Sequence, residues 1–270
     1  MSKRVLITGC SSGIGRAACG VLTRRGYEVI ATARSLEALA DLPAAQKLAL
    51  DVTSDASVAR AVAQMGRVDV VVNNAGVGIW APVEAPPMDD IIGVFETNVF
   101  GAVRVLQAVL PQMRQRREGI AIQVSSAAGQ VSSPLLGHYS ASKHALEAYS
   151  ESLRLEVAPF GVKVAIMELG AVESDFPKNR IVTSTPEYAK VVEGFTRAIA
   201  ANRGTTTSSE KVAEELAAII ADGASALRYW STPDAKPIVD RRRARSDAEN
   251  EAIMLADAGL ADGIPVESTR

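Results

Sequence analysis

The sequence predicts an α/β protein with a doubly wound parallel sheet of about seven strands and helices on both faces. Short apolar runs alternate with helical periods along most of the chain, which is the order that right-handed βαβ units produce. Most of the runs are apolar at consecutive positions, as strands covered on both faces require. Of the 270 residues, 47% are hydrophobic and 22% are charged, as is usual for a globular protein.

Four strands are expected in the first half of the chain. Each is a short apolar or β-branched run, and they span 4–8, 27–33, 47–51 and 68–74. Helices are expected between them at 13–25, 35–42 and 54–65. The first helix has its apolar residues on one face and ends at Arg24 and Arg25 before Gly26, as helix C-termini prefer.

The alternation continues in the second half. One long helix or two in series are expected over 88–115, and further helices over 139–160 and 210–222. Strands are expected at 119–125, 162–169 and 227–231. We therefore expect a single domain over 1–232 and a polar extension over 233–270, in which Ser246 and Glu249 form a capping box for a short helix.

Charge and cysteine content exclude several classes of protein. The net charge is -2, so the basic run at 241–245 is interpreted as a solvated edge, and no nucleic-acid partner is expected. Cys10 and Cys19 form no C-x-x-C pair, which predicts neither a disulfide framework nor a metal site. No apolar stretch approaches the roughly 18 residues of a membrane span, so we expect a cytoplasmic protein.

A glycine-rich turn, TGCSSGIG at 8–15, lies between the first expected strand and the first expected helix. Glycine permits unusual backbone angles and lets a pyrophosphate approach the backbone, while the helix N-terminus offers N–H groups and a positive dipole. The spacing is G-x-x-x-G-x-G, and a plain tight turn is the alternative interpretation. We predict that a dinucleotide's phosphates are bound here by Gly9, Ser11, Ser12, Gly13, Ile14 and Gly15.

The residue after the second strand indicates which dinucleotide is bound. An NAD site usually has Asp or Glu there, to bond the ribose hydroxyls. This chain has Arg34 after Ala33 and no carboxylate, and a guanidinium binds a phosphate through two hydrogen bonds. The position favours NADP(H) over NAD(H), with a solvated loop arginine as the alternative.

Four residues suggest acid–base catalysis. Tyr139 and Lys143 share a helix face, and an ammonium beside a phenol lowers the pKa of the phenol from about 10. Ser126 follows the strand 119–125, at the edge where such sheets bind ligands, and its hydroxyl is suited to hold a substrate oxygen. Asn98 lies in an apolar helix and binds backbone carbonyls, or a water next to Lys143, or is a satisfied core amide.

Together these motifs resemble the short-chain dehydrogenases/reductases over roughly residues 3–232. The matches are the turn at 8–15, Asp51-Val52, NNAG at 73–76, Asn98, Ser126 and YSASK at 139–143. The resemblance implies a Rossmann-type fold and an oxidoreductase that uses a nicotinamide cofactor to interconvert an alcohol and a ketone or aldehyde.

The resemblance also implies roles for the matched residues. Tyr139 would exchange the proton, Ser126 would polarise the carbonyl, Lys143 would hold the nicotinamide ribose and lower the pKa of Tyr139, and Asn98 would order a proton-relay water. The other positions implied to line the cofactor are Asp51 and Val52 at the adenine, Asn74, Ala75 and Gly76 at its middle, and Gly170 and Val172 at the nicotinamide.

Within the family, VLITGCSSGIG, GRVDVVVNNAG and ALRYWST look most like the 17β-hydroxysteroid and retinol dehydrogenase branch, which implies a lipophilic substrate. Leu169 departs from the family, which usually has Pro there, and this removes a fixed φ before the substrate lid expected at about 171–208. Substrate contacts are therefore harder to transfer. Candidates, each of which could equally be core or lid packing, are Trp80, Leu135, Leu136, Phe176, Tyr188 and Phe195.

Two other functions stay open at this point. One is a 3-oxoacyl thioester reductase, and the other is a non-catalytic NADP(H)-binding sensor, because a fold alone does not establish turnover. The family resemblance further implies a homodimer or homotetramer assembled through the helices at 88–115 and 139–158.

Overall fold

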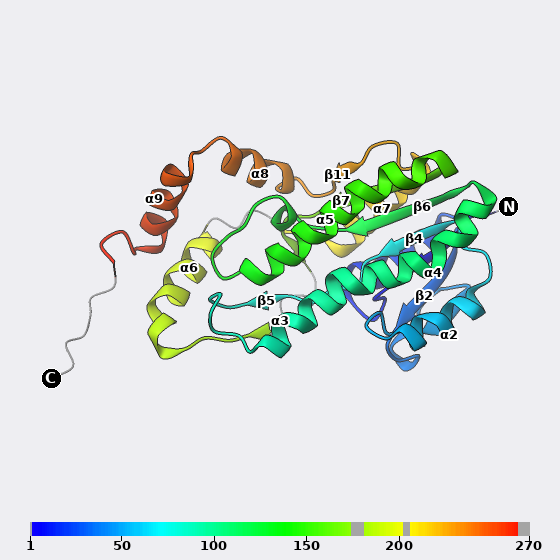
Figure 1. Ribbon diagram of the computed structural model, residues 1–270, viewed down its shortest axis with the longest axis horizontal. Helices are drawn as coiled ribbons and strands as arrows, with labels where there is room; N and C mark the ends of the chain where they lie inside the picture. The colour runs from blue at the N-terminus through cyan, green and yellow to red at the C-terminus, as the bar shows by residue number, and fades with distance from the viewer. Residues whose placement is uncertain (1, 174–180, 202–205, 264–270) are drawn as a thin grey trace.

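The computed structural model describes residues 2–173, 181–201 and 206–263. Its centre is a seven-stranded parallel sheet with the order β11-β7-β6-β4-β1-β2-β3 (Figure 1). This confirms the predicted fold class. The strands are β1 (Arg4–Ile7), β2 (Glu28–Ala33), β3 (Gln46–Ala49), β4 (Val70–Asn73), β6 (Gly119–Val124), β7 (Val162–Glu168) and β11 (Arg228–Trp230).

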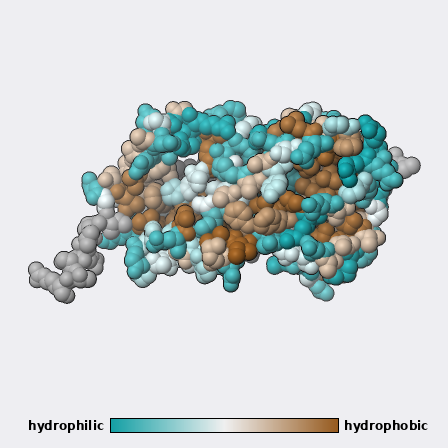
Figure 2. All heavy atoms as spheres, in the orientation of Figure 1, coloured by the Kyte–Doolittle hydropathy of each residue, from teal (hydrophilic) through white to brown (hydrophobic). Residues whose placement is uncertain are grey.

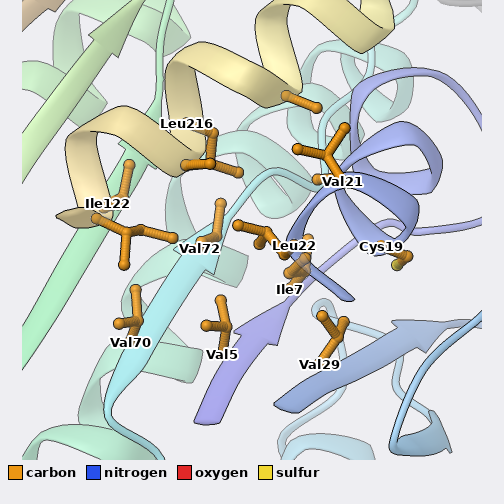
Figure 3. Close-up of a cluster of buried hydrophobic side chains, with 14 of the residues drawn as sticks. Val5, Ile7, Cys19, Val21, Leu22, Val29, Val70, Val72, Ile122 and Leu216 are labelled. Carbon is orange, nitrogen blue, oxygen red and sulfur yellow. The ribbon is translucent and has the colours of Figure 1, made fainter. Parts of the chain in front are cut away.

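Helices cover both faces of this sheet. One face carries α1 (Gly13–Arg24) and α7 (Ser209–Ala221), and the other carries α2 (Asp55–Met65), α4 (Gly101–Arg116) and α5 (Gly137–Val157). Successive residues of β1 point to opposite faces, so Val5 and Ile7 pack with Leu22 and Leu216, as Figure 3 shows, while Leu6 joins the opposite cluster. Both faces are therefore apolar.

The sheet order reverses at β1, which pairs with β2 on one side and β4 on the other. The chain therefore leaves the carboxyl ends of adjacent strands in opposite directions, which opens a crevice between their loops. Ligands of doubly wound sheets bind in this crevice. The glycine-rich turn begins α1 at this point, so the topology places the predicted phosphate site at the switch.

Several local elements differ from the prediction. The segment expected as a helix at 35–42 forms only a short 3-10 turn, Glu37–Leu39. The segment after residue 87 agrees with the prediction of one long helix or two in series: α3 (Met88–Phe95) and α4 are joined without a break by a π-helical turn at Glu96–Phe100. Four two-residue strands were not predicted, because two residues carry no periodic signal: β5 (Ile79–Trp80) pairs with β9 (Ile181–Val182), and β8 (Val172–Glu173) with β10 (Thr207–Ser208).

The C-terminal segment folds against the rest of the chain. The predicted capping box is present, with Ser246 and Glu249 exchanging hydrogen bonds at the start of α9 (Asp247–Ala258). Helix α8 (Ala235–Arg243) was not predicted and buries Ala235. Helix α9 packs on α6 (Ala189–Ala201) through an apolar cluster, and hydrophobic residues are also visible at this end of the molecule in Figure 2.

By length and composition alone, the helical run Met88–Arg116 is apolar enough to cross a membrane, contrary to our expectation. In the structure its second half packs against the sheet, where Val105, Val109 and Met113 are fully buried. This is the pattern of a core helix. Cys10 and Cys19 are free and buried.

Candidate active site

A cleft of about 870 Å³ lies at the carboxyl ends of the central strands and is formed by loops from across the sheet. Sixteen predicted site residues line it: Gly9, Ser11, Ser12, Gly13, Ile14, Arg34, Asp51, Val52, Asn74, Ala75, Gly76, Ser126, Tyr139, Lys143, Gly170 and Val172. Two more, Gly15 and Asn98, lie behind this lining. Residues predicted from separate motifs are thus brought together in one cavity.

The glycine-rich turn has the shape that a phosphate site needs. Gly9 has φ +74°, and a Cβ on it would lie 2.8 Å from the Cα of Ala75. A Cβ on Gly15 would lie 2.4 Å from the carbonyl oxygen of Gly9, so the first turn of α1 packs directly on the strand end. Ser12 caps the helix without a side-chain hydrogen bond, which leaves first-turn N–H groups available to an anion. The turn fits the phosphates of a dinucleotide.

Thr8 holds the turn and the opposite loop together. Its hydroxyl oxygen accepts hydrogen bonds from the backbone N–H groups of Asn74 and Ala75, each at 3.0 Å. The Asn74 side chain donates in return to the carbonyl oxygens of Thr8, at 2.9 Å, and Gly9, at 3.2 Å. Sequence reasoning assigned Thr8 no role, although the residue belongs to the motif. Its position directly before Gly9, at the end of a buried strand, was the available signal.

The end of the cleft predicted to hold the adenine carries the charged side chains that the sequence indicated. Arg34 is exposed, lines the cleft, and has no carboxylate partner among the described residues. Asp51 follows β3 and accepts hydrogen bonds from the N–H and hydroxyl groups of Thr53, at 3.0 and 2.8 Å. The guanidinium of Arg34 is thus available to bind a ligand anion.

Tyr139, Lys143 and Ser126 meet on the other side of the cleft. The Lys143 ammonium donates to the carbonyl oxygen of Val124 at 2.9 Å and lies 5.7 Å from the centre of the Tyr139 ring. The Ser126 hydroxyl donates to the carbonyl oxygen of Leu169 at 3.0 Å and hydrogen-bonds the Tyr139 side chain. The first turns of α5 and the carboxyl end of β6 thereby place a phenol, an ammonium and a hydroxyl together.

Burial is the largest cause of the pKa shifts of Tyr139 and Lys143. It raises the pKa of Tyr139 to about 12, and the hydrogen bond with Ser126 opposes that rise. Burial also lowers the pKa of Lys143 to about 8, against the attraction of Glu147. The expected lowering of the Tyr139 pKa by Lys143 is therefore not found in the protein alone, where burial and the bond with Ser126 are the causes that act on the phenol.

Asn98 is buried in the π-helical turn. Its side chain accepts from the N–H of Val77 at 2.8 Å, and it donates to the carbonyl oxygen of Val77 and to the hydroxyl of Ser142, both at 3.0 Å. Of the alternatives left open by the sequence, the structure shows backbone binding, and these contacts also make Asn98 a satisfied core amide. The ordering of a proton-relay water by Asn98 stays a prediction.

Two residues that sequence reasoning missed hold the loop after β7. The N–H of Gly170 donates to the Thr232 hydroxyl, and the N–H of Ala171 donates to the Asp234 carboxylate, each at 2.7 Å. A Cβ on Gly170 would lie 2.2 Å from an oxygen of Asp234. These contacts fix the backbone where Leu169 replaces the family's proline.

Some of the candidate substrate contacts line the cleft, and others do not. Trp80 and Leu136 line the cleft, whereas Leu135 and Phe195 pack in the apolar cluster between α6 and α9. Tyr188 is outside the lining, and Phe176 lies outside the described residues. In the parts of the chain that the structure describes, no group of three His, Cys, Asp or Glu side chains is placed to hold a metal ion.

Comparisons with known proteins agree with this geometry. A family profile described as short chain dehydrogenase matches residues 3–183. The chain is 38% identical to 3-ketodihydrosphingosine reductase of Bacteroides thetaiotaomicron, over 72% of this chain and 74% of that protein. It is 35% identical to human 17-beta-hydroxysteroid dehydrogenase type 1, over 88% of this chain and 80% of that one.

Solved structures share the architecture. A short-chain dehydrogenase from Streptomyces avermitilis superposes with a TM-score of 0.82 at 36% identity, covering 96% of this chain and 97% of that one. A serine dehydrogenase in its closed form, complexed with NADP+, superposes with a TM-score of 0.70 at 25% identity, covering 80% of this chain and 88% of that one.

Proposed function

We infer that this chain, which belongs to the short-chain dehydrogenase family, is an NADP(H)-dependent enzyme that interconverts a secondary alcohol and a ketone, or an aldehyde, on a lipophilic small molecule. Membership of the family makes it an oxidoreductase acting on CH–OH groups. The observation that carries the finer proposal is the meeting of Tyr139, Lys143 and Ser126 in the cleft that begins at the glycine-rich turn.

The residues of the cleft suit a nicotinamide dinucleotide. The turn at Gly9–Gly15 and the N-terminus of α1 would hold the phosphates, and Lys143 would hold the nicotinamide ribose. The cofactor, when bound, supplies or accepts the hydride. The chain's own part is to orient the reactants and to move the proton.

Tyr139 is the proposed proton donor in the reducing direction and the acceptor in the other. With a pKa raised to about 12, its hydroxyl is fully protonated at neutral pH and can donate to a carbonyl oxygen that gains charge. Ser126 already hydrogen-bonds Tyr139, so a substrate oxygen placed between them would receive one hydrogen bond from Tyr139 and, once the Ser126 hydroxyl turns away from the Leu169 carbonyl, a second from Ser126. The Lys143 ammonium favours the phenolate that remains after proton transfer.

The lining near Tyr139 supports a lipophilic substrate. Trp80, Leu136 and Leu169 contribute apolar surface. Among the described residues that line this part of the cleft, Lys143 carries the formal charge. Within the described residues, an ionised carboxylate or phosphate on the substrate would have no second cation to bind near Tyr139. The names of two relatives, which refer to a ketosphingoid base and a steroid, also support this substrate class.

The preference for NADP(H) rests on Arg34. Its exposed guanidinium has no carboxylate partner within the described residues, and it lines the adenine end of the cleft together with Asp51. A 2′-phosphate there would receive a charge-assisted hydrogen bond. The similar serine dehydrogenase is complexed with NADP+, which is in keeping with this proposal.

Assembly and location stay proposals. A homodimer or homotetramer through α4 and α5 is supported by apolar residues that are exposed on or next to these helices, including Phe100, Tyr149 and Leu155. A cytoplasmic location is proposed from the cysteine usage, since Cys10 and Cys19 indicate no disulfide framework and a reducing compartment is then the default.

The test is NADPH consumption at 340 nm with purified protein and a panel of ketones and aldehydes, from small aryl ketones to steroids and retinal. We expect turnover on one lipophilic class, and loss of that turnover in Tyr139→Phe with NADPH affinity retained. Tyr149→Phe, which removes an exposed phenol from the same helix, is the matched control and should keep full activity. Turnover by Tyr139→Phe would contradict the assignment, and NADPH binding without turnover on any panel member would favour the sensor.

A further inference from the structure

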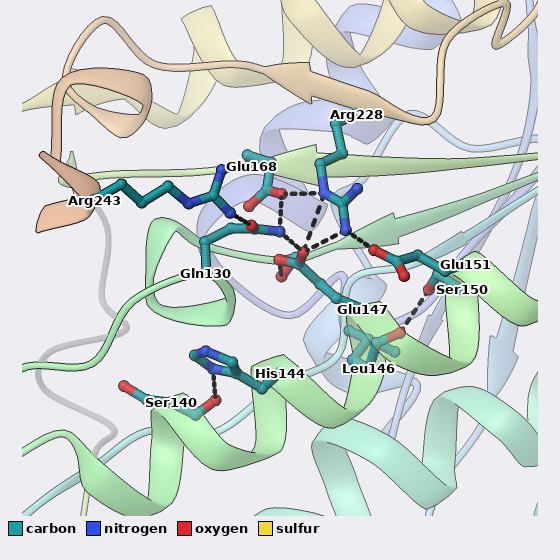
Figure 4. A network of polar contacts seen from close by, with 11 residues as sticks. Gln130, Ser140, His144, Leu146, Glu147, Ser150, Glu151, Glu168, Arg228 and Arg243 are labelled. Atoms are coloured by element: carbon teal, nitrogen blue, oxygen red, sulfur yellow. Dashed lines mark hydrogen bonds and ion pairs between the residues drawn. The ribbon is translucent and has the colours of Figure 1, made fainter. Parts of the chain in front are cut away.

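Two buried carboxylates, Glu147 on α5 and Glu168 at the end of β7, lie close together around the side chain of Arg228 (Figure 4). Glu147 is 3% exposed and Glu168 is 0% exposed. Ion pairs join both to Arg228 of β11, at 3.1 Å to Glu147 and 3.3 Å to Glu168. Gln130 donates to both carboxylates, and it accepts in turn from Arg243 of α8.

Glu168 is mostly protonated at neutral pH. Two buried anions side by side repel each other, and one guanidinium, shared with the exposed Glu151, does not neutralise both. Burial and the neighbouring Glu147 raise the pKa of Glu168 to about 8. Glu168 therefore holds a proton at neutral pH, beside the carboxylate of Glu147.

Glu147 connects this pair to the reacting groups in two ways. It lies one helical turn after Lys143, and its charge opposes the lowering of the Lys143 pKa by burial. Its other oxygen accepts a hydrogen bond from Ser125 at 2.8 Å, and Ser125 directly precedes Ser126. Helix α5 is thus joined to the end of β6 by two successive contacts, Lys143 to the Val124 carbonyl and Glu147 to Ser125.

The turn that follows Ser126 is shaped around this carboxylate. A Cβ on Gly129 would lie 2.2 Å from an oxygen of Glu147 and 2.8 Å from the hydroxyl of Ser125. A side chain at Gly129 would therefore displace Glu147 or the turn. The backbone that carries Ser126 is closely packed on Glu147.

We propose that Glu147 is a positioning residue of this enzyme: through Ser125 it sets Ser126 against Tyr139, and its charge keeps Lys143 an ammonium, while Glu168 and Arg228 hold it in place. This inference rests on the proposed reductase function. Nothing in it requires Glu147 to touch substrate or cofactor. Its contribution is to the geometry and charge of the groups that do.

The charged and titratable groups around Glu147 come from every element packed on it. Lys143 and Glu151 lie on its own helix, Glu168 on β7, Arg228 on β11, and Arg243 of α8 acts through Gln130. His144 on the same helix is exposed and is bonded to the carbonyl oxygen of Ser140. Of these groups, Lys143 and Glu168 titrate near pH 8.

The experiment compares Glu147→Gln with Glu151→Gln, which removes another partner of Arg228 at a side chain that is 53% exposed. The kcat and KM for a ketone are measured from pH 6 to 10, and NADPH affinity by fluorescence. For Glu147→Gln we expect kcat to fall about ten-fold, with the alkaline limb of the kcat profile at lower pH by about half a unit or more, because Lys143 loses its anionic neighbour. NADPH affinity and the whole Glu151→Gln profile should match wild type.

A merely structural role would lower kcat equally at every pH and leave the limb in place, and that result overturns the proposal. If Glu147→Gln does not fold, Glu147→Asp is the substitute: it keeps the charge at a shorter reach, so kcat should fall while the limb stays at the wild-type pH. A limb that moves in Glu147→Asp also overturns the proposal.

A measurement without substrate separates this inference from the proposed function. Because the pKa of Glu168 is raised from 4.5 to about 8, its proton stabilises the folded state at low pH, and this stability is lost as the pH rises toward 8. Glu168→Gln, which mimics the protonated form, should remove that part of the pH dependence of chemical unfolding. If the unfolding free energy of Glu168→Gln depends on pH as in wild type, Glu168 does not hold the proton, whether or not a ketone is reduced. If that dependence is lost but no ketone is turned over, only the reductase assignment is contradicted.

Discussion

Replacing Thr8 by Val should separate the contribution of one hydroxyl to the cofactor site. The side chain is 1% exposed, and valine has nearly the same shape. The substitution leaves the N–H groups of Asn74 and Ala75 without their shared acceptor. An unsatisfied buried donor costs about 1–3 kcal/mol, and because both residues are only partly buried we expect the lower part of this range for each, about 2–3 kcal/mol together.

The assay for Thr8→Val is the free energy of unfolding in urea, together with the midpoint of thermal unfolding and the Kd for NADPH. A loss of about 2–3 kcal/mol corresponds to a midpoint lower by roughly 5–10 °C in a chain of this size. NADPH affinity should fall as well, since the Asn74–Gly76 loop lines the cleft and loses its attachment to β1.

Thr8→Ser is the matched control, because it keeps the hydroxyl and loses one methyl group. It should retain most of the stability and nearly all of the NADPH affinity. Equal losses in Thr8→Ser and Thr8→Val would show that packing, not the hydroxyl, holds the loop. A stable Thr8→Val with wild-type NADPH affinity would refute the reasoning altogether.

Three further changes test other parts of the cleft. Arg34→Asp should raise the KM for NADPH by about 100-fold and change the KM for NADH little, because it replaces the proposed partner of the 2′-phosphate with a like charge; equal effects on both would exclude that contact. Gly170→Ala should lower kcat about ten-fold or more, because its Cβ would lie 2.2 Å from an oxygen of Asp234. If this contact is the cause, the same substitution in an Asp234→Ala background should lower kcat much less. The pKa of Lys143 is lowered from 10.5 to about 8, so this side chain binds a proton more readily in the unfolded chain than in the folded one. The protonated ammonium therefore lowers the free energy of unfolding below pH 8, and this loss disappears as the pH rises to 10.5. Lys143→Met should therefore be more stable than wild type by roughly 2 kcal/mol at pH 7, after loss of the hydrogen bond to Val124, with no gain near pH 10.5; a difference that does not vary with pH would contradict the burial argument.

The parts of the fold and site that could be predicted are those with a local signal. The seven central strands are short apolar runs between turn residues, and their alternation with helices determines the parallel sheet. The turn at Gly9–Gly15 and the Tyr139–Lys143 spacing are also local patterns. The carboxyl edge of a parallel sheet then brings such motifs together, so one cleft holds residues predicted separately.

The parts that could not be predicted depend on contacts between distant positions. Thr232 and Asp234 hold Gly170 and Ala171 from about sixty residues further along, and no periodicity marks them. The raised pKa of Tyr139 was missed for the same reason, because burial is a property of the assembled site and the sequence showed only the nearby ammonium. Helix α8 was missed because a segment with three consecutive arginines shows little apolar pattern.

The described residues of the C-terminal part of the chain support the cleft without lining it. No described residue after Val172 lines it, yet Thr232 and Asp234 fix the backbone of Gly170 and Ala171, which do. Arg228 holds Glu147 behind Lys143 in the same way. The phosphate end, by contrast, is built from Gly9 to Gly15 and fixed by neighbouring strands. Variation after residue 183, where the family profile ends, should therefore affect the geometry of hydride and proton transfer more than the binding of the dinucleotide phosphates.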